Sequence, residues 1–299
     1  MTAPADLLDD ALERICGEVD DLFGVLLPVP PDLRAPLFEA MRYAAIGGGK
    51  RLRPLLVVAS AGLFHVDRQR SLRAGVAAEA IHVYSLIHDD LPCMDDDDLR
   101  RGKPTLHRAF DECTAVLAGD SLHALAFEIL ADEATHEDPF VRAELVMALA
   151  HAAGPSGMAG GQMMDIAAPG AALDLPAVTR LQQLKTGALF GFCLEAGGIM
   201  GRVPPEGRGK LRAFARDMGL AFQIADDLLD EEGSEEKTGK AVGKDRARGK
   251  ETFVTLLGHE RARQQAEMLA DQAIGHLSSF GAEADLLRAI ARFTVARDH

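Results

Sequence analysis

Apolar residues recur at three- and four-residue steps along most of the chain. The spacing is clearest over 69–91, 114–134 and 208–232, which are also rich in Ala, Leu and Glu. Alternation of apolar and polar residues at every second position, which is typical of a half-buried strand, is scarce. The pattern therefore predicts an all-α protein.

Glycine and proline clusters interrupt this helical pattern at 27–32, 47–50, 167–173, 201–207 and 233–250. None of the breaks is long or biased enough to be a domain linker, and the chain has no fixed-period repeat. All-helical enzymes of this length often keep a single core. We therefore expect one all-α domain over residues 1–299.

The composition excludes several classes of protein. Hydrophobic residues make up 47% of the chain, and no stretch reaches the roughly 18 uninterrupted apolar residues that a membrane span needs. The N-terminal segment MTAPADLLDDALERI is acidic and has no apolar core, unlike a signal or transit peptide. We expect a cytoplasmic protein with no membrane span.

The net charge of −14 disfavours nucleic acid and anionic membranes as partners. A phosphate-bearing ligand would have to be held locally, by clustered bases or by bridging cations. The cysteines stand far apart without a CxxC pair, which argues against a zinc site and a disulfide framework; they are Cys16, Cys93, Cys113 and Cys193.

Two aspartate clusters stand out. The first, in LIHDDLPCMDDDDLRRGKPTLH at 86–107, places six aspartates within ten positions. Asp95 to Asp98 alone could be a solvated helix start, but Asp89 and Asp90 end a strongly apolar helix, so at least one should meet a cavity. An EF-hand loop fails because Leu91 and Cys93 stand where oxygen ligands are needed and Met94 stands where glycine is needed.

The second cluster, FQIADDLLD at 222–230, contains Asp226, Asp227 and Asp230. Asp226 and Asp230 are four residues apart and share one helix face, where they repel unless a cation lies between them. Carboxylates without cysteine or histidine partners select hard cations, and Mg²⁺ completes its shell with water and phosphate oxygens. Two such helices suggest a clamp for a polyphosphate.

Basic residues complete the pattern. GGGKRLRP at 47–54 places Lys50, Arg51 and Arg53 where a helix could begin, which suits an anion, although it lacks the P-loop signature. Arg100 and Arg101 directly follow the first aspartate cluster. Either group alone could be part of an ordinary turn or could neutralise nearby aspartates. The functional prediction therefore rests on the complete set of motifs.

That set resembles the polyprenyl synthetase family of short-chain trans-prenyltransferases, in its bacterial type. The first aspartate motif carries the two-residue insertion (DDxxxxD) of that type, and the second is an intact DDxxD. The resemblance runs from about residue 40 to the C-terminus, through GGKRLRP, HDDLPCMDDDDLRRGKPTLH, LAGDSL, LKTG, GLAFQIADDLLD, TGKAVGKD and GKET.

The resemblance implies a helical bundle around a central cavity, a homodimer, and three Mg²⁺ ions. It implies head-to-tail condensation of isopentenyl diphosphate with an allylic diphosphate (dimethylallyl or geranyl) by ionisation, condensation and elimination. The implied metal ligands are Asp89, Asp90, Asp95, Asp226, Asp227 and Asp230. On an unbroken helix Asp96 rather than Asp95 would share the face of Asp89, and we expect Pro92 to disturb that turn.

The resemblance also assigns the substrates. Isopentenyl diphosphate would be held by Lys50, Arg53, His82 and Arg101. The allylic diphosphate would be held by Arg100, Lys185 and Lys240, with the Thr186 and Gln223 dipoles directed at the developing cation, and Lys250 is a further substrate-binding residue. Segment 233–250, which also contains Lys244 and Asp245, is either a surface loop or a lid that excludes water.

Product length is predicted from the residues before Asp89. Helical spacing nominates Ser85, His82 and Ile81 for the pocket wall. In the resembling family, an aromatic at the position of Tyr84 commonly stops growth at fifteen carbons. The sequence therefore predicts farnesyl diphosphate as the main product, with geranylgeranyl diphosphate as the alternative.

Other classes fit less well. A terpene cyclase has no use for a second diphosphate site and usually replaces the second DDxxD. A non-catalytic relative would have lost aspartates or lysines, and a purely structural bundle would require both aspartate clusters to be coincidental.

Overall fold

The computed structural model describes residues 4–232 and 250–296. Over these residues it is helical, apart from one pair of two-residue strands. The prediction of an all-α fold is confirmed. The elements are α1 (Pro4–Leu26), α2 (Ala35–Ala45), α3 (Leu52–Gly62), α4 (Arg68–Asp89), β1 (Leu99–Arg100), β2 (Lys103–Pro104), α5 (Leu106–Ala109), α6 (Glu112–Ala131), α7 (Pro139–Ala153), α8 (Met158–Ala167), α9 (Leu175–Gln182), η1 (Gln183–Gly187), α10 (Ala188–Met200), η2 (Pro205–Arg208), α11 (Gly209–Glu232), α14 (Phe253–Leu257), α15 (His259–His276), η3 (Ala282–Ala284) and α16 (Asp285–Ala296).

Local chemistry sets several helix starts. Asp67 accepts a hydrogen bond from the backbone N–H of Arg70 at the start of α4, and Asp111 accepts one from Thr114 at the start of α6. Each aspartate satisfies a donor that the first helical turn leaves unpaired. Polar residues flanking the apolar runs therefore fix where α4 and α6 begin.

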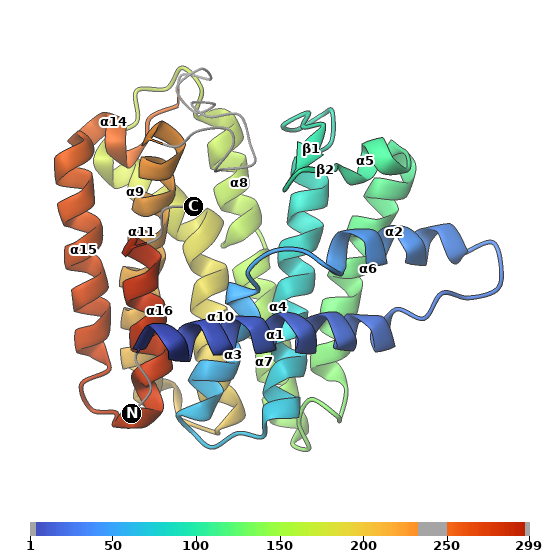
Figure 1. Ribbon diagram of the computed structural model, residues 1–299, viewed down its shortest axis with the longest axis horizontal. Helices are drawn as coiled ribbons and strands as arrows, with labels where there is room; N and C mark the ends of the chain where they lie inside the picture. The colour runs from blue at the N-terminus through green and yellow to red at the C-terminus, as the bar shows by residue number, and fades with distance from the viewer. Residues whose placement is uncertain (1–3, 233–249, 297–299) are drawn as a thin grey trace.

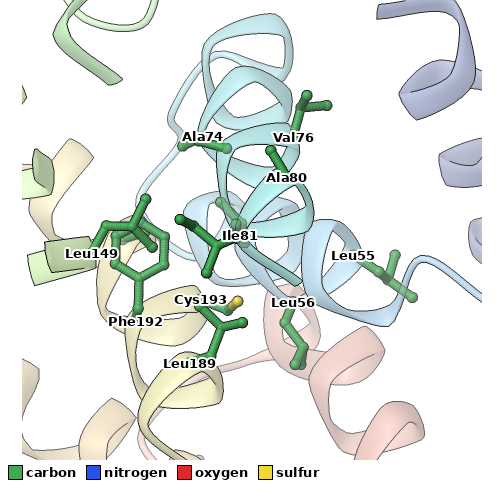
Figure 2. Close-up of a cluster of buried hydrophobic side chains, with 14 of the residues drawn as sticks. Leu55, Leu56, Ala74, Val76, Ala80, Ile81, Leu149, Leu189, Phe192 and Cys193 are labelled. Carbon is green, nitrogen blue, oxygen red and sulfur yellow. The ribbon is translucent and has the colours of Figure 1, made fainter. Parts of the chain in front are cut away.

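The centre of the bundle is formed by α3, α4 and α10. Gly197 on α10 allows close approach to α3, because a Cβ atom there would lie 2.3 Å from the backbone nitrogen of Ala61. The main apolar cluster extends from α1 to α16. Figure 2 shows its central part, which includes Leu55, Leu56, Ala74, Val76, Ala80, Ile81, Leu149, Leu189, Phe192 and Cys193. The single-domain assignment for 1–299 stays a prediction.

Most long helices run along one common direction, and α1 lies across them (Figure 1). It contacts α3, α4 and α16. The first aspartate cluster begins at the C-terminal end of α4, and the second lies near the C-terminal end of α11. Both helix ends are found at the same end of the bundle (Figure 1). The fold therefore brings together two acidic segments separated by more than one hundred residues of chain.

The pair β1–β2 is a short antiparallel hairpin that periodicity did not predict. Its turn residues Arg101 and Gly102 both have positive φ, at 52° and 74°. This is the geometry of the tight hairpin turn whose twist matches that of the strands. The hairpin therefore separates the side chains of Arg100 and Arg101, which are adjacent in sequence.

One helix within residues 4–232 and 250–296, α6, is long and apolar enough to cross a membrane by length and composition alone. One face of α6 is buried, and the helix packs against α2, α4 and α7. A core helix of a globular protein meets the same criterion, so this is weak evidence for a span.

Candidate active site

A cavity of about 580 Å³ lies between the end of α4, the helix α8, the π-helix η1 and α11. It collects residues predicted for four different roles. The predicted residues that line it are Arg53, His82, Tyr84, Ser85, Asp89, Asp95, Arg100, Lys185, Thr186 and Asp226. Lys50, Asp90, Arg101, Gln223, Asp227, Asp230 and Lys250 are not among its lining residues. Lys240, Lys244, Asp245 and most of the predicted lid lie outside the described residues.

Asp89 and Asp95 are brought together by the way α4 ends. The helix stops at Asp89, and the following chain turns back so that the backbone N–H of Asp95 donates to the carbonyl oxygen of Asp89 at 2.8 Å. Asp96 takes a left-handed conformation, with φ of 51°, and is exposed. The expectation that residues seven positions apart share a helix face therefore does not apply to Asp89 and Asp96. Asp95 rather than Asp96 lines the cavity. Pro92 lies beyond the helix end, as proline often does.

Burial of the Asp89 carboxyl raises its pKa to about 6, and the neighbouring carboxylate of Asp95 acts in the same direction. The side chain of Gln162 donates to Asp89 at 2.8 Å. A buried carboxylate beside a second one is stabilised by a cation.

The second member of each aspartate pair has a protein partner. Asp90 is 3% exposed and accepts two hydrogen bonds from Nε of Arg100, at 2.8 and 2.9 Å. Asp227 accepts from the side chain of Gln223 at 3.1 Å and from the backbone of Phe253 at 3.0 Å, which joins α11 to α14. The metal-binding roles of Asp90, Asp227 and Asp230 stay predictions.

Among the described residues, no three histidine, cysteine, aspartate or glutamate side chains converge as a ready-made metal site. Asp89 at the end of α4, Asp95 in the segment that follows and Asp226 on α11 nevertheless line one cavity and supply only oxygen atoms. Such a set fits Mg²⁺, which commonly takes one or two carboxylates and completes its shell with water and phosphate oxygens.

The basic residues near α3 form a second group. The buried Nε of Arg53 has no hydrogen-bond partner among the described residues, and its guanidinium lies over the Phe190 ring at 5.2 Å. Burial lowers the pKa of His82, and the positive charges of Arg53 and Arg101 lower it further. His82 is therefore neutral, and it lies among arginines whose charge suits an anion.

A third group surrounds η1, which carries Lys185 and Thr186. Lys185 donates to Asp165 at 2.6 Å, and Lys250 donates to the same carboxylate oxygen at 2.8 Å. Gly161 permits this arrangement, because a Cβ atom there would lie 2.2 Å from the backbone nitrogen of Lys185. The Thr186 hydroxyl donates to the side-chain oxygen of Gln223 at 3.2 Å.

Two polar residues of α8 were missed by the sequence analysis. Gln162 and Asp165 contact Asp89, Lys185 and Lys250. Their three-residue spacing in GGQMMD places both on one helix face after a glycine pair, and that spacing is the signal that could have identified them.

Tyr84 lines the cavity one turn before Asp89, as does Ser85. The Tyr84 ring packs edge-to-face against His88 on its own helix, at 5.7 Å, and against His123 on α6, at 5.0 Å. The ring is therefore held from two sides at the wall of the cavity. Ile81 is fully buried in the core.

The fold and this acidic and basic cavity are those of a diphosphate-handling, all-α prenyl synthase. The Polyprenyl synthetase sequence profile matches residues 34–292, so the chain belongs to that family, as its motifs indicated. It is a prenyltransferase.

Individual relatives cover almost the whole chain. Farnesyl diphosphate synthase of Bacillus subtilis (strain 168) is 43% identical over 269 residues, which are 90% of this chain and 91% of that protein. Geranylgeranyl pyrophosphate synthase 11, chloroplastic, of Arabidopsis thaliana is 44% identical over 280 residues, or 91% of this chain and 78% of that protein. The crystal structure of an FPP/GFPP synthase from Zymomonas mobilis, 61% identical, superposes with a TM-score of 0.90 and covers 98% of this chain and 100% of that one.

Proposed function

We propose that the protein condenses isopentenyl diphosphate head-to-tail with dimethylallyl and geranyl diphosphates and releases farnesyl diphosphate. The observation that carries this proposal is the single cavity lined by Asp89, Asp95 and Asp226 together with Arg53 and Lys185. Carboxylates suited to Mg²⁺ and bases suited to diphosphate line one space that is large enough for a prenyl chain.

The carboxylates of Asp89 and Asp95 on one side, and of Asp226 on the other, would hold the Mg²⁺ ions, three of them with diphosphate present. Bound Mg²⁺ neutralises the charge of the allylic diphosphate and makes it a better leaving group. Lys185, Lys250 and Arg100 are the direct contacts to that diphosphate, and Lys240 is expected to join them. Asp165 now accepts hydrogen bonds from both lysines, so an entering diphosphate competes with it.

The chemistry proceeds in three steps. The carbon–oxygen bond of the allylic substrate breaks, and the electron pair leaves with diphosphate. The double bond of isopentenyl diphosphate then attacks the allylic cation to form the new carbon–carbon bond. A proton is finally lost to the departed diphosphate. Thr186 lines the cavity and donates a hydrogen bond to the side-chain oxygen of Gln223, so the dipoles of these two residues would stabilise the developing cation.

Isopentenyl diphosphate is assigned to Lys50, Arg53, His82 and Arg101. The buried Nε of Arg53 has no hydrogen-bond partner within residues 4–232 and 250–296, which supports this assignment, because a buried donor without a partner is costly and a diphosphate oxygen would satisfy it. His82, being neutral, can donate one hydrogen bond without adding a charge.

The farnesyl product rests on Tyr84, whose ring stands at the cavity wall and is supported by His88 and His123. Relatives named for other products, such as the FPP/GFPP synthase and the geranylgeranyl synthase, make longer chains the alternative. Chromatography of the product made from isopentenyl diphosphate, geranyl diphosphate and Mg²⁺ decides between them. A cyclised hydrocarbon would indicate a terpene cyclase, and binding without turnover would indicate a regulatory relative.

We further propose that the protein is a cytoplasmic homodimer. The neighbouring helices α6 and α7 leave large apolar side chains exposed, which suits an interface between two copies; these are Val116, Leu117, Phe140 and Met147. Light scattering coupled to size-exclusion chromatography tests this, and a monomer at micromolar concentration would contradict it.

A further inference from the structure

The loop 47–51 joins α2 to α3 and carries Lys50. Gly47, Gly49 and Arg51 all have positive φ, at 75°, 80° and 50°. Glycine adopts this conformation readily, but arginine does so only at an energetic cost. Contacts from the rest of the molecule must therefore keep this loop in its shape.

The side chain of Arg51 makes the first of these contacts. Arg51 is 3% exposed, and its Nη1 donates to Glu79 on α4 at 2.9 Å. Its Nη2 donates to Oδ1 of Asp20 on α1 at 2.7 Å and to the carbonyl oxygen of Ala45. These protein acceptors engage both Nη atoms of Arg51. Arg51, grouped with Lys50 and Arg53 in the sequence motif, therefore has a different role from a substrate-binding base.

Asp20 makes the second contact. While Oδ1 accepts from Arg51, its Oδ2 accepts from the backbone N–H of Gly47 at 3.0 Å. One carboxylate of α1 thus binds the first and the last residue of the loop. Asp20 lies outside the residues 34–292 that match the family profile, so the family comparison gives it no role.

The loop in turn supports the bases assigned to isopentenyl diphosphate. The guanidinium of Arg101 lies against the loop, so that a Cβ atom at Gly49 would be 2.3 Å from its Nη1. Burial lowers the pKa of both Arg53 and Arg101, and the negative charge of Glu79 opposes this shift. A shift of the loop would therefore move Lys50 and Arg101 relative to Arg53.

We propose that Asp20 is a positioning residue for the isopentenyl diphosphate site, acting through Arg51 and Gly47. The inference rests on the proposed function, because it takes the loop and Arg101 to face that substrate. Holding the loop in advance reduces the ordering that the substrate must otherwise impose, which increases its affinity. Among the described residues, the hydrogen bonds of Asp20 go to Arg51 and Gly47, so the allylic site on the side of Lys185 should not respond.

The variant Asp20→Asn tests this, because an amide cannot accept hydrogen bonds at both ends of its side chain. We expect the KM for isopentenyl diphosphate to rise roughly ten-fold, as loss of a charged hydrogen bond suggests, while kcat and the KM for geranyl diphosphate stay within about two-fold. Asp20→Glu, which keeps the charge, should recover part of the affinity.

Two variants of α1 serve as matched controls. Asp21→Asn alters the adjacent, exposed carboxylate. Glu18→Gln breaks the ion pair with Arg68, at 2.7 Å, that also attaches α1 to α4 without touching the loop. Both should leave the KM for isopentenyl diphosphate unchanged. Thermal unfolding of each variant shows whether its loss of stability follows the same order as its KM for isopentenyl diphosphate.

The inference is overturned if Asp20→Asn leaves that KM unchanged in an enzyme whose wild type turns over isopentenyl diphosphate. It is also overturned if Glu18→Gln raises the KM equally, because general docking of α1 would then explain the effect. A wild-type protein that does not consume isopentenyl diphosphate overturns the proposed function, and this inference with it.

Discussion

Asp95→Asn and Asp96→Asn form a closely matched pair of variants, because the two carboxylates are adjacent in sequence but only that of Asp95 lines the cavity. Asp95 lines the cavity beside Asp89, whereas Asp96 is exposed and left-handed, a conformation that asparagine tolerates well. Asp95→Asn removes one negative charge from the proposed metal site and conserves the size of the side chain. Asp96→Asn changes the formal charge of the protein equally without changing the site.

The expected magnitude follows from the role of a carboxylate that holds a charge-neutralising cation. Its loss removes about 3–5 kcal/mol of transition-state stabilisation, which corresponds to about 10²–10⁴ in turnover. We therefore expect Asp95→Asn to lose activity by that factor and Asp96→Asn to stay within about three-fold of wild type. The same range applies to Asp89→Ala and Asp226→Ala.

The assay is the initial rate of condensation of geranyl and isopentenyl diphosphates at saturating Mg²⁺, with circular dichroism as a check on helical content. Near-normal turnover of Asp95→Asn, or an equal loss in Asp96→Asn with the helices intact, would refute the reasoning. The first result would remove Asp95 from the metal site. The second would show that total charge near the cavity, and not ligand geometry, controls the rate.

Tyr84→Ala should shift the product from fifteen to twenty or more carbons, while Tyr84→Phe, which keeps the ring, should not. Chromatography of the products decides, and an unchanged fifteen-carbon product from Tyr84→Ala would place the pocket floor elsewhere. In steady-state kinetics, Arg53→Ala should chiefly raise the KM for isopentenyl diphosphate. Lys185→Ala should chiefly raise the KM for the allylic substrate and slow the ionisation step. The opposite pattern would show that the two sites are reversed. The pKa of Asp89, about 6, lies above its ordinary value, so below about pH 6 the folded protein holds a proton there that must leave before a cation binds. The Mg²⁺ concentration for half-maximal rate should therefore rise as the pH falls through about 6, by up to about ten-fold per pH unit, and a requirement that is independent of pH would count against Asp89 as a ligand.

Periodicity predicted the long helices well because their apolar faces are continuous. The expected helix over 69–91 is α4 (Arg68–Asp89), and that over 208–232 is α11 (Gly209–Glu232). The β1–β2 hairpin was missed because a two-residue strand has no period. Whether Asp95 or Asp96 joins Asp89 was left open by spacing alone, since it depends on where α4 ends and on the turn that follows.

The sequence identified the residue types of the site, but it could not tell which aspartate of each adjacent pair lines the cavity. Asp89 lines the cavity and Asp90 is buried against Arg100, because adjacent helical positions point about 100° apart. Asp20 and Asp165 were missed for a different reason. They lie on α1 and α8, and their partners are far away in the sequence, so these contacts depend on tertiary packing and not on local pattern.

The central claim is that one cavity joins an allylic diphosphate to isopentenyl diphosphate with the help of Mg²⁺. The most direct test is to incubate the purified protein with geranyl diphosphate and isotopically labelled isopentenyl diphosphate, with and without Mg²⁺, and to analyse the product by chromatography and mass spectrometry. We expect labelled farnesyl diphosphate that forms only with the metal. Elongation that persisted after complete removal of divalent cations, or geranyl diphosphate consumed without incorporation of the label, would contradict it.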